Sequence, residues 1–231
     1  MARTIFWFRW TVFLLAAFYC LRMLFFSDWA SFGGPFRYLT VWALFLSFFA
    51  ASRMMALMEG RSTRRWDGYV SAVSVVNAMV VILYWRLWFA DPYSVQADGQ
   101  LGVWWLELYL HGLGPLLQWI DATFIHRAYR RLGAAALWTL GIVMAFVLWM
   151  ELILQPLNAT PRGSVTTGLS YPFLNSLLWE DRLAFYGSNI AAAMVLLLVF
   201  AGIAWAVRRS VPALMTMPGL KQDMEGAPTT D

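Results

Sequence analysis

The stretch Leu110-His111-Gly112-Leu113-Gly114-Pro115 lies inside a long apolar run and holds one of the two histidines of the chain. A proline cannot donate a backbone hydrogen bond to the carbonyl four residues earlier, and its ring clashes with that carbonyl. For Pro115 this carbonyl belongs to His111, so a helix that carries the stretch is expected to kink at the histidine. Gly112 and Gly114 lack side-chain bulk and let a ligand or another helix approach the backbone. The stretch therefore predicts either a functional site, as intramembrane ionisable residues usually mark, or a packing kink whose histidine bonds a neighbour.

The composition of the whole chain is that of a membrane protein. Of its 231 residues, 61% are hydrophobic and 13% are charged, whereas a soluble domain carries roughly 25% charged residues. The 14 tryptophans and nine tyrosines suit aromatic belts at both membrane interfaces. The single cysteine, Cys20, excludes an internal disulfide and a cysteine-based metal cage. We expect an integral, multi-pass membrane protein that contacts lipid and does not bind nucleic acid.

Six segments are apolar over about 20 residues, the length that a membrane-spanning helix needs. They are Phe6–Phe26, Tyr38–Met58, Tyr69–Phe89, Val103–Ile125, Ala134–Leu154 and Leu183–Val207. The first is expected to be a retained anchor, because no small-residue cleavage site follows it. The longest connection includes Tyr171-Pro172-Phe173-Leu174, which we interpret as a re-entrant or interfacial piece. The sequence predicts an all-α, six-helix transmembrane domain over residues 1–209 and a disordered cytoplasmic tail over residues 210–231.

The loop charges orient these helices. If six helices alternate, ten basic residues share one side: Arg3, Arg61, Arg64, Arg65, Arg127, Arg130, Arg131, Arg208, Arg209 and Lys221. Only three, at positions 37, 162 and 182, fall on the other side. Because basic loops stay in the cytoplasm, both termini are predicted to be cytoplasmic. His111 then lies ~12 Å inside the outer boundary, near enough to the depth of Thr40 for the two to meet, whereas His126 belongs to a solvated basic face.

Thr40 is the candidate nucleophile on the second predicted helix. Gly33-Gly34-Pro35 is a helix start signal that ends five residues before it. Helical side chains tilt toward the N-terminus, so the hydroxyl points back toward free N–H groups and the positive end of the helix dipole. Those groups could stabilise a developing oxyanion. The alternative is that the hydroxyl bonds its own helix or a neighbouring one.

Two acids are candidates to orient His111. Glu107 lies four residues earlier on the same helix face. It either completes a nucleophile–base–orienter set or is solvated near the outer membrane interface. Glu151, in the outer half of the fifth predicted helix, is the second candidate. Arg37 and Arg182, at outer helix edges, either hold a substrate carboxylate or anchor headgroups.

Other charges at membrane depth should pair or reach the interface. We expect Asp121 to pair with Arg53, and Arg9 to extend its long side chain to the interface. The chain has no G-x-S-x-G elbow, P-loop or H-E-x-x-H motif. Neither a metal nor an organic cofactor is expected.

Three blocks of the sequence together resemble one family. Gly33-Gly34-Pro35-Phe36-Arg37-Tyr38-Leu39-Thr40 resembles the entry to the second helix in the androgen-inducible, integral-membrane threonine hydrolase family. The stretch from His111 to Asp121 resembles its histidine helix, although Gly112-Leu113 stand where the family has small hydroxyl residues and the proline comes one place early. The third block is similar to its last segment and comprises Tyr171-Pro172-Phe173-Leu174, Arg182 and Phe185-Tyr186-Gly187-Ser188.

The resemblance implies an intramembrane hydrolase that cleaves lipid esters such as fatty acid esters of hydroxy fatty acids. It implies Thr40 as the nucleophile and His111 as the general base, with no cofactor. Two other interpretations stay open. One is a non-catalytic membrane scaffold or lipid-binding subunit of a larger complex. The other is a haem-binding subunit with His111 as an axial ligand, which would need a second ligand from elsewhere.

Overall fold

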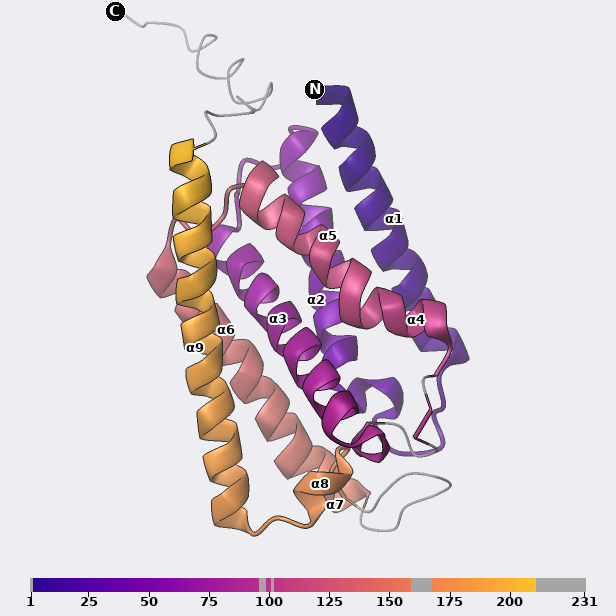
Figure 1. The fold of residues 1–231 in the computed structure, drawn as a ribbon. Coiled ribbons are helices and arrows are strands. Elements are labelled where there is room, and N and C mark those ends of the chain that lie inside the picture. The colour runs from indigo at the N-terminus through magenta and orange to yellow at the C-terminus, as the bar shows by residue number, and fades with distance from the viewer. Residues whose placement is uncertain (1, 96–98, 101, 159–167, 211–231) are drawn as a thin grey trace, which may run out of the picture.

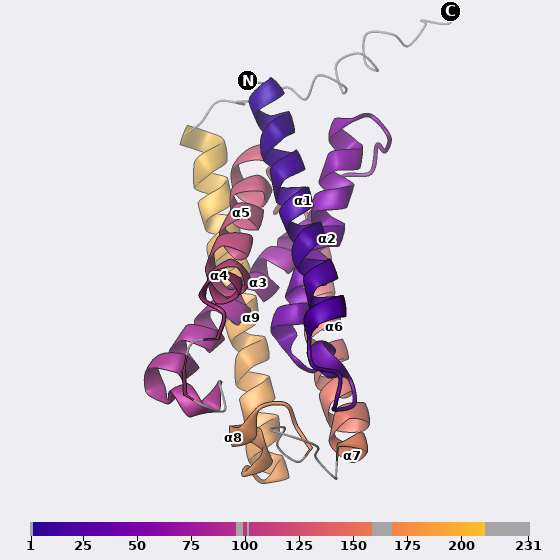
Figure 2. The same ribbon diagram turned by 90° about the vertical axis from the view of Figure 1, so that its right-hand side faces the viewer.

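The computed structural model describes residues 2–95, 99–100, 102–158 and 168–210, and within them the chain is a helical bundle (Figures 1 and 2). Its long helices are α1 (Ala2–Phe26), α2 (Leu39–Met58), α3 (Asp67–Ala90), α6 (Leu132–Leu148) and α9 (Trp179–Ser210). These five, with α6 extended to Leu157, are long and apolar enough to cross a membrane. The prediction of an all-α, integral, multi-pass membrane protein is confirmed. The predicted tail, beyond Ser210, lies outside the described residues.

The remaining elements are short. They are the 3₁₀ helices η1 (Gly34–Arg37) and η2 (Pro92–Ser94), the α-helices α4 (Trp104–Leu108), α5 (Gly114–Ile120), α7 (Gln155–Leu157) and α8 (Pro172–Asn175), and the π-helical turns η3 (Tyr109–Leu113), η4 (Asp121–Ile125) and η5 (Trp149–Leu154). The fourth predicted span is thus a run from Trp104 to Ile125 in which α and π turns alternate. This run is not among the five apolar spans, because it carries several buried polar side chains: Glu107, His111, Gln118, Asp121 and Thr123.

The helix is interrupted at the predicted place, and the interruption is a π turn. The Gly114 N–H donates to the Tyr109 carbonyl five residues earlier. A Cβ on Gly114 would lie 2.9 Å from that carbonyl oxygen, so the turn requires glycine. The His111 carbonyl, which Pro115 cannot bond, accepts the indole N–H of Trp85 at 2.9 Å. Helix α3 therefore satisfies the polar group that the proline leaves open.

Helix α3 is the centre of the bundle. It packs against α2, α5, α6 and α9, while α1 packs on the other side of α2. Small and β-branched residues from Gly68 to Val76 are buried along it, which lets its neighbours approach closely. The start of α1 and the end of α9 lie at the same end of the bundle (Figure 1). This arrangement fits an even number of crossings, and the cytoplasmic side remains the one predicted from the loop charges.

The predicted partner of Asp121 was wrong. Arg9, not Arg53, holds it, with Nη2 2.8 Å from Oδ1 and Nε 2.9 Å from Oδ2. The Arg9 Nη1 also donates to the Met54 carbonyl at 3.1 Å. Arg9 is 2% exposed and Asp121 1% exposed, so this arginine does not reach the interface. A buried charge needs such a partner, and the pair ties α1 to α2 and η4.

The prediction for His126 was also wrong, because this histidine is only 1% exposed. Its Nε2 lies 3.0 Å from Oδ1 of Asp67 at the start of α3. The adjacent Arg130 is exposed and does belong to the expected basic face. The sequence pattern placed this loop at the correct end of the bundle but could not show that the histidine turns inward.

Candidate active site

The turn before α2 places Thr40 at the second position of that helix. Gly33-Gly34 have φ angles of 83° and 45°, which side-chain-bearing residues rarely adopt. The Phe36 carbonyl accepts the indole N–H groups of Trp42 at 3.0 Å and Trp149 at 3.1 Å. The turn is therefore hydrogen-bonded to both α2 and η5. These bonds fix the backbone from which the Thr40 side chain extends.

Thr40, His111 and Glu107 form a continuous chain of polar contacts. The Thr40 Oγ1 lies 3.2 Å from Nε2 of His111, and His111 Nδ1 lies 3.0 Å from Oε2 of Glu107. His111 is 5% exposed and Glu107 is 8% exposed. Low solvent exposure strengthens such contacts. The order hydroxyl, imidazole, carboxylate is the one that activates an alcohol nucleophile and holds its base.

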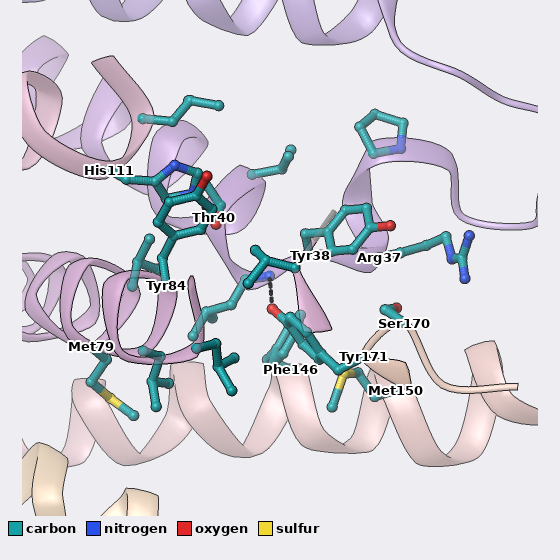
Figure 3. A pocket seen from close by; sticks show the side chains of 18 of the residues that line it. Arg37, Tyr38, Thr40, Met79, Tyr84, His111, Phe146, Met150, Ser170 and Tyr171 are labelled. Atoms are coloured by element: carbon teal, nitrogen blue, oxygen red, sulfur yellow. Dashed lines mark hydrogen bonds between the residues drawn. The ribbon is translucent and has the colours of Figure 1, made fainter. Parts of the chain in front are cut away.

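Helix α3 fixes the imidazole from one side. The Tyr84 ring stacks on the His111 ring, with centroids 3.5 Å apart and planes 6° from parallel (Figure 3). The next residue, Trp85, bonds the His111 carbonyl. Sequence reasoning missed both residues, because they were two of the many tryptophans and tyrosines that suit aromatic belts at the membrane interfaces. The one feature of the sequence that could have indicated them is their position near the outer end of the third predicted span, at the depth predicted for His111.

A cavity of about 760 Å³ opens beside the Thr40 and His111 side chains (Figure 3). Much of its lining is apolar and comes from α3, α6 and α9, including Met79, Val80, Leu83, Val143, Phe146, Val147 and Phe185. An apolar chamber with a few converging polar groups is the usual form of a small-molecule site. Such a chamber can accept an acyl chain next to the Thr40 hydroxyl.

The predicted re-entrant piece forms another wall of the cavity. It folds into α8, and the Asn175 side chain binds both the N–H and the carbonyl of Leu169 at 2.9 Å. From this braced segment the Tyr171 hydroxyl accepts the Leu39 N–H at 3.2 Å (Figure 3). Tyr171 thus reaches the N-terminus of α2, one residue before Thr40.

Arg37 lines the same cavity with donors that lack acceptors. It is 3% exposed, and neither its Nε nor its Nη2 has a hydrogen-bond partner among the described residues. The hydroxyls of Ser31 and Ser170 also have no hydrogen-bond partner among the described residues, and both line the same cavity. Burial lowers the pKa of the Arg37 guanidinium, because desolvation penalises its charge, and Tyr38 and Asp28 partly offset this. Unsatisfied buried donors of this kind call for an anionic acceptor.

Glu151 and Arg182 are paired with each other. The Arg182 Nε is 3.0 Å from Oε1 of Glu151, which also accepts the Tyr186 hydroxyl at 2.6 Å. Neither residue lines the cavity. Of the two candidate acids, only Glu107 contacts His111. Of the two candidate arginines, Arg37 has unpaired donors at the cavity and Arg182 is already bound to a carboxylate.

A family model described as FAR-17a/AIG1-like protein matches residues 3–204. The match spans the bundle from α1 into α9 and includes every residue of the site. No curated protein and no solved structure is significantly similar to the chain.

Proposed function

The chain belongs to the FAR-17a/AIG1-like family, and we propose that it is an intramembrane hydrolase that cleaves lipid esters through Thr40. The observation that carries this proposal is the 3.2 Å contact between Thr40 Oγ1 and His111 Nε2 at the wall of an apolar cavity. An alcohol is a weak nucleophile at its own pKa and needs an adjacent base. Family membership agrees with the resemblance noted in the sequence, and the proposed chemistry rests on the geometry.

The reaction has two halves. In the first, Thr40 Oγ1 attacks the ester carbonyl while its proton passes to His111 Nε2. The tetrahedral intermediate then breaks its bond to the alcohol oxygen, which takes the proton from His111 and leaves Thr40 acylated. In the second half, His111 takes a proton from water as the water attacks the acyl-threonine. The acid is released, and Thr40 regains its proton.

Glu107 acts in both halves through its contact with His111 Nδ1, 3.0 Å away. A carboxylate at this distance keeps the proton on Nδ1, so that Nε2 is the free base that faces Thr40. It also stabilises the imidazolium that forms when Nε2 accepts a proton. Glu107 thereby serves as the positioning residue of the set.

The lining of the cavity supports, as the substrate, an ester that carries a free carboxylate, such as a fatty acid ester of a hydroxy fatty acid. Its apolar walls suit the acyl chain that is transferred to Thr40. The unpaired donors of Arg37, with the hydroxyls of Ser31 and Ser170, suit the carboxylate of the other half. A charge-assisted contact with a guanidinium is stronger than a neutral hydrogen bond and favours such an ester over one without a charge.

Hydrolysis by the purified full chain in detergent tests the proposal. Thr40→Ala should lower turnover of such an ester by about 10³-fold or more, since no other group replaces the nucleophile. Thr40→Ser keeps a hydroxyl and should retain measurable turnover. The matched control is Thr139→Ala, because Thr139 is fully buried, bonds the Ala135 carbonyl at 2.8 Å and does not line the cavity.

Three outcomes decide the matter. Loss in Thr40→Ala with full activity in Thr139→Ala supports the proposal. Equal activity in Thr40→Ala and the wild type overturns it. An absence of ester hydrolysis in folded wild-type protein also overturns it and favours a non-catalytic, lipid-binding role.

A further inference from the structure

The Tyr171 hydroxyl has an unused donor at the wall of the cavity. A tyrosine hydroxyl can donate one hydrogen bond and accept others. In the structure it accepts the Leu39 N–H at 3.2 Å, and its own proton goes to no acceptor among the described residues. The same side chain lines the cavity that Thr40 and His111 line. The proton is therefore available to a group that enters the cavity.

The position of this hydroxyl relative to Thr40 is fixed by backbone geometry. Leu39 is the first residue of α2 and Thr40 the second. The hydroxyl is held at the Leu39 amide, at the end of the helix where the dipole is positive. Figure 3 shows the hydrogen bond at the Tyr171 hydroxyl as a dashed line, with the Thr40 and His111 side chains on the far side of the amide from Tyr171. Thr40 follows Leu39 at the same end of the helix, and both Thr40 and Tyr171 line the cavity.

We propose that the Tyr171 hydroxyl donates a hydrogen bond to the ester carbonyl oxygen as Thr40 attacks it. The inference rests on the proposed hydrolase function. As the bond between Thr40 Oγ1 and the carbonyl carbon forms, the π electron pair of the carbonyl moves to its oxygen, and Tyr171 stabilises the negative charge without transferring its proton. When the carbonyl re-forms, the bond to the leaving alcohol breaks and His111 supplies the proton that the alcohol needs. Hydrolysis of the acyl-threonine passes through a second oxyanion at the same place.

The state of the phenol suits this role. Burial raises the pKa of Tyr171 to about 12, because desolvation disfavours the phenolate. The group thus keeps its proton at neutral pH. A donor that stays protonated and is already held in place needs little reorganisation when charge develops, which is the source of oxyanion stabilisation.

A purely structural role for Tyr171 is the competing explanation, because its hydroxyl also satisfies the Leu39 amide. The two roles differ in what they change. A structural contact affects the stability of the bundle and the placement of α2. An oxyanion donor affects kcat, leaves KM nearly unchanged, and makes the rate depend on the acidity of the phenol.

Tyr171→Phe tests the inference against the matched control Tyr69→Phe. Tyr69 is also a buried tyrosine whose hydroxyl bonds the α2 backbone, with the Leu46 carbonyl as acceptor at 2.9 Å, but it does not line the cavity. Loss of one oxyanion donor lowers kcat by about 10²-fold or more, so Tyr171→Phe should do so with KM within about threefold of the wild type. Tyr69→Phe should leave both constants unchanged. Thermal melts identify any loss of folded protein.

Replacement of Tyr171 by 3,5-difluorotyrosine gives a second readout that keeps both hydrogen bonds. Its more acidic phenol should introduce a fall in kcat at a lower alkaline pH than in the wild type. A kcat in Tyr171→Phe within threefold of the wild type, or an unshifted pH profile in the fluorinated variant, overturns the inference and leaves the proposed function standing. The absence of Thr40-dependent hydrolysis in the wild type overturns both.

Discussion

The two histidines of the chain lie near opposite ends of one helical run, and both are buried beside a carboxylate. His111 Nδ1 is 3.0 Å from Glu107, and His126 Nε2 is 3.0 Å from Asp67. The exposed fractions are 5% and 1%. By burial and acid partner alone the two sites are equivalent.

They differ in what else each pair contacts. The second nitrogen of His111 faces the Thr40 hydroxyl, at the wall of the large cavity. Asp67 instead shares its carboxylate with Arg65, 3.2 Å away, and Arg65 also donates to the His126 carbonyl at 2.6 Å. A buried histidine–carboxylate pair therefore does not by itself indicate catalysis. A nucleophile on the second imidazole nitrogen and space for a substrate mark the His111 pair as a candidate site. At the other pair, Arg65 binds the carboxylate and the backbone carbonyl of the histidine, so the pair links α3 to the loop before α6.

Exchanging each histidine in turn for glutamine should give the largest difference between the two sites. His111→Gln removes the proposed base and should lower kcat/KM by roughly 10²–10⁴-fold, the usual contribution of general-base catalysis. His126→Gln should leave turnover per folded molecule unchanged, because His126 does not line the cavity beside Thr40. Steady-state hydrolysis normalised to folded protein measures both. Equal losses in the two variants would mean that the two histidines do not differ in their role in turnover.

Replacing the two carboxylates should likewise lower kcat at the His111 site only, and by a smaller factor than replacing the histidines. Glu107→Gln keeps the volume of the side chain but removes the charge that orients His111, so kcat should fall by about 10²-fold with little change in KM. Asp67→Asn should not alter kcat. A kcat for Glu107→Gln equal to that of the wild type would mean that another group, such as the stacked Tyr84, is enough to hold the ring.

The arginines near the two sites should also differ in their effect on substrate binding. Arg37 has unpaired donors in the cavity, whereas Arg65 is bound to Asp67. Loss of a charge-assisted hydrogen bond costs about 1.5–3 kcal/mol, so Arg37→Gln should raise KM for a carboxylate-bearing ester by roughly 10–100-fold. KM for the methyl ester of the same substrate should stay unchanged, and Arg65→Gln should affect neither. An equal rise for the acid and its methyl ester would exclude Arg37 from carboxylate recognition.

The smallest expected effect is on stability at the His126 site. Asp67→Asn weakens the contacts with both His126 and Arg65 and should lower the free energy of unfolding by about 1–3 kcal/mol. Thermal unfolding of the purified protein in detergent, at equal detergent concentration, gives the comparison with the wild type. Unchanged stability would mean that the loop is held by other contacts, such as the bond from Tyr129 N–H to Ser71 Oγ.

The sequence predicted those features that depend on local chemistry. Apolar length identified the five long helices that can cross a membrane. Pro115 identified the break in the fourth helical run, and depth counted along two helices brought Thr40 close to His111. Each of these follows from chain geometry over a few turns. The contact with Glu107 was predictable as one of two options, because four residues along a helix is a fixed neighbour relation.

Features set by how helices pack were not predictable in this way. Depth alone could not choose between Glu107 and Glu151, because it does not say which face of the fifth span turns inward. Asp121 was expected to meet Arg53, yet it meets Arg9, since the rotation of α1 against α2 decides which arginine points to it. The stacking of Tyr84 on His111 likewise depends on the position of α3, which no motif in the sequence records.

In the proposed mechanism Thr40, and no other hydroxyl, forms the covalent intermediate. It can be tested by mass spectrometry of the purified wild-type protein after treatment with a fluorophosphonate probe. The activated nucleophile of a hydrolase that forms an acyl-enzyme attacks such a probe as it attacks an ester. We expect one adduct, on the peptide that contains Thr40. It should be absent in Thr40→Ala and strongly reduced in His111→Gln but not in His126→Gln. An adduct on another serine or threonine, together with full ester hydrolysis by Thr40→Ala, would contradict this mechanism.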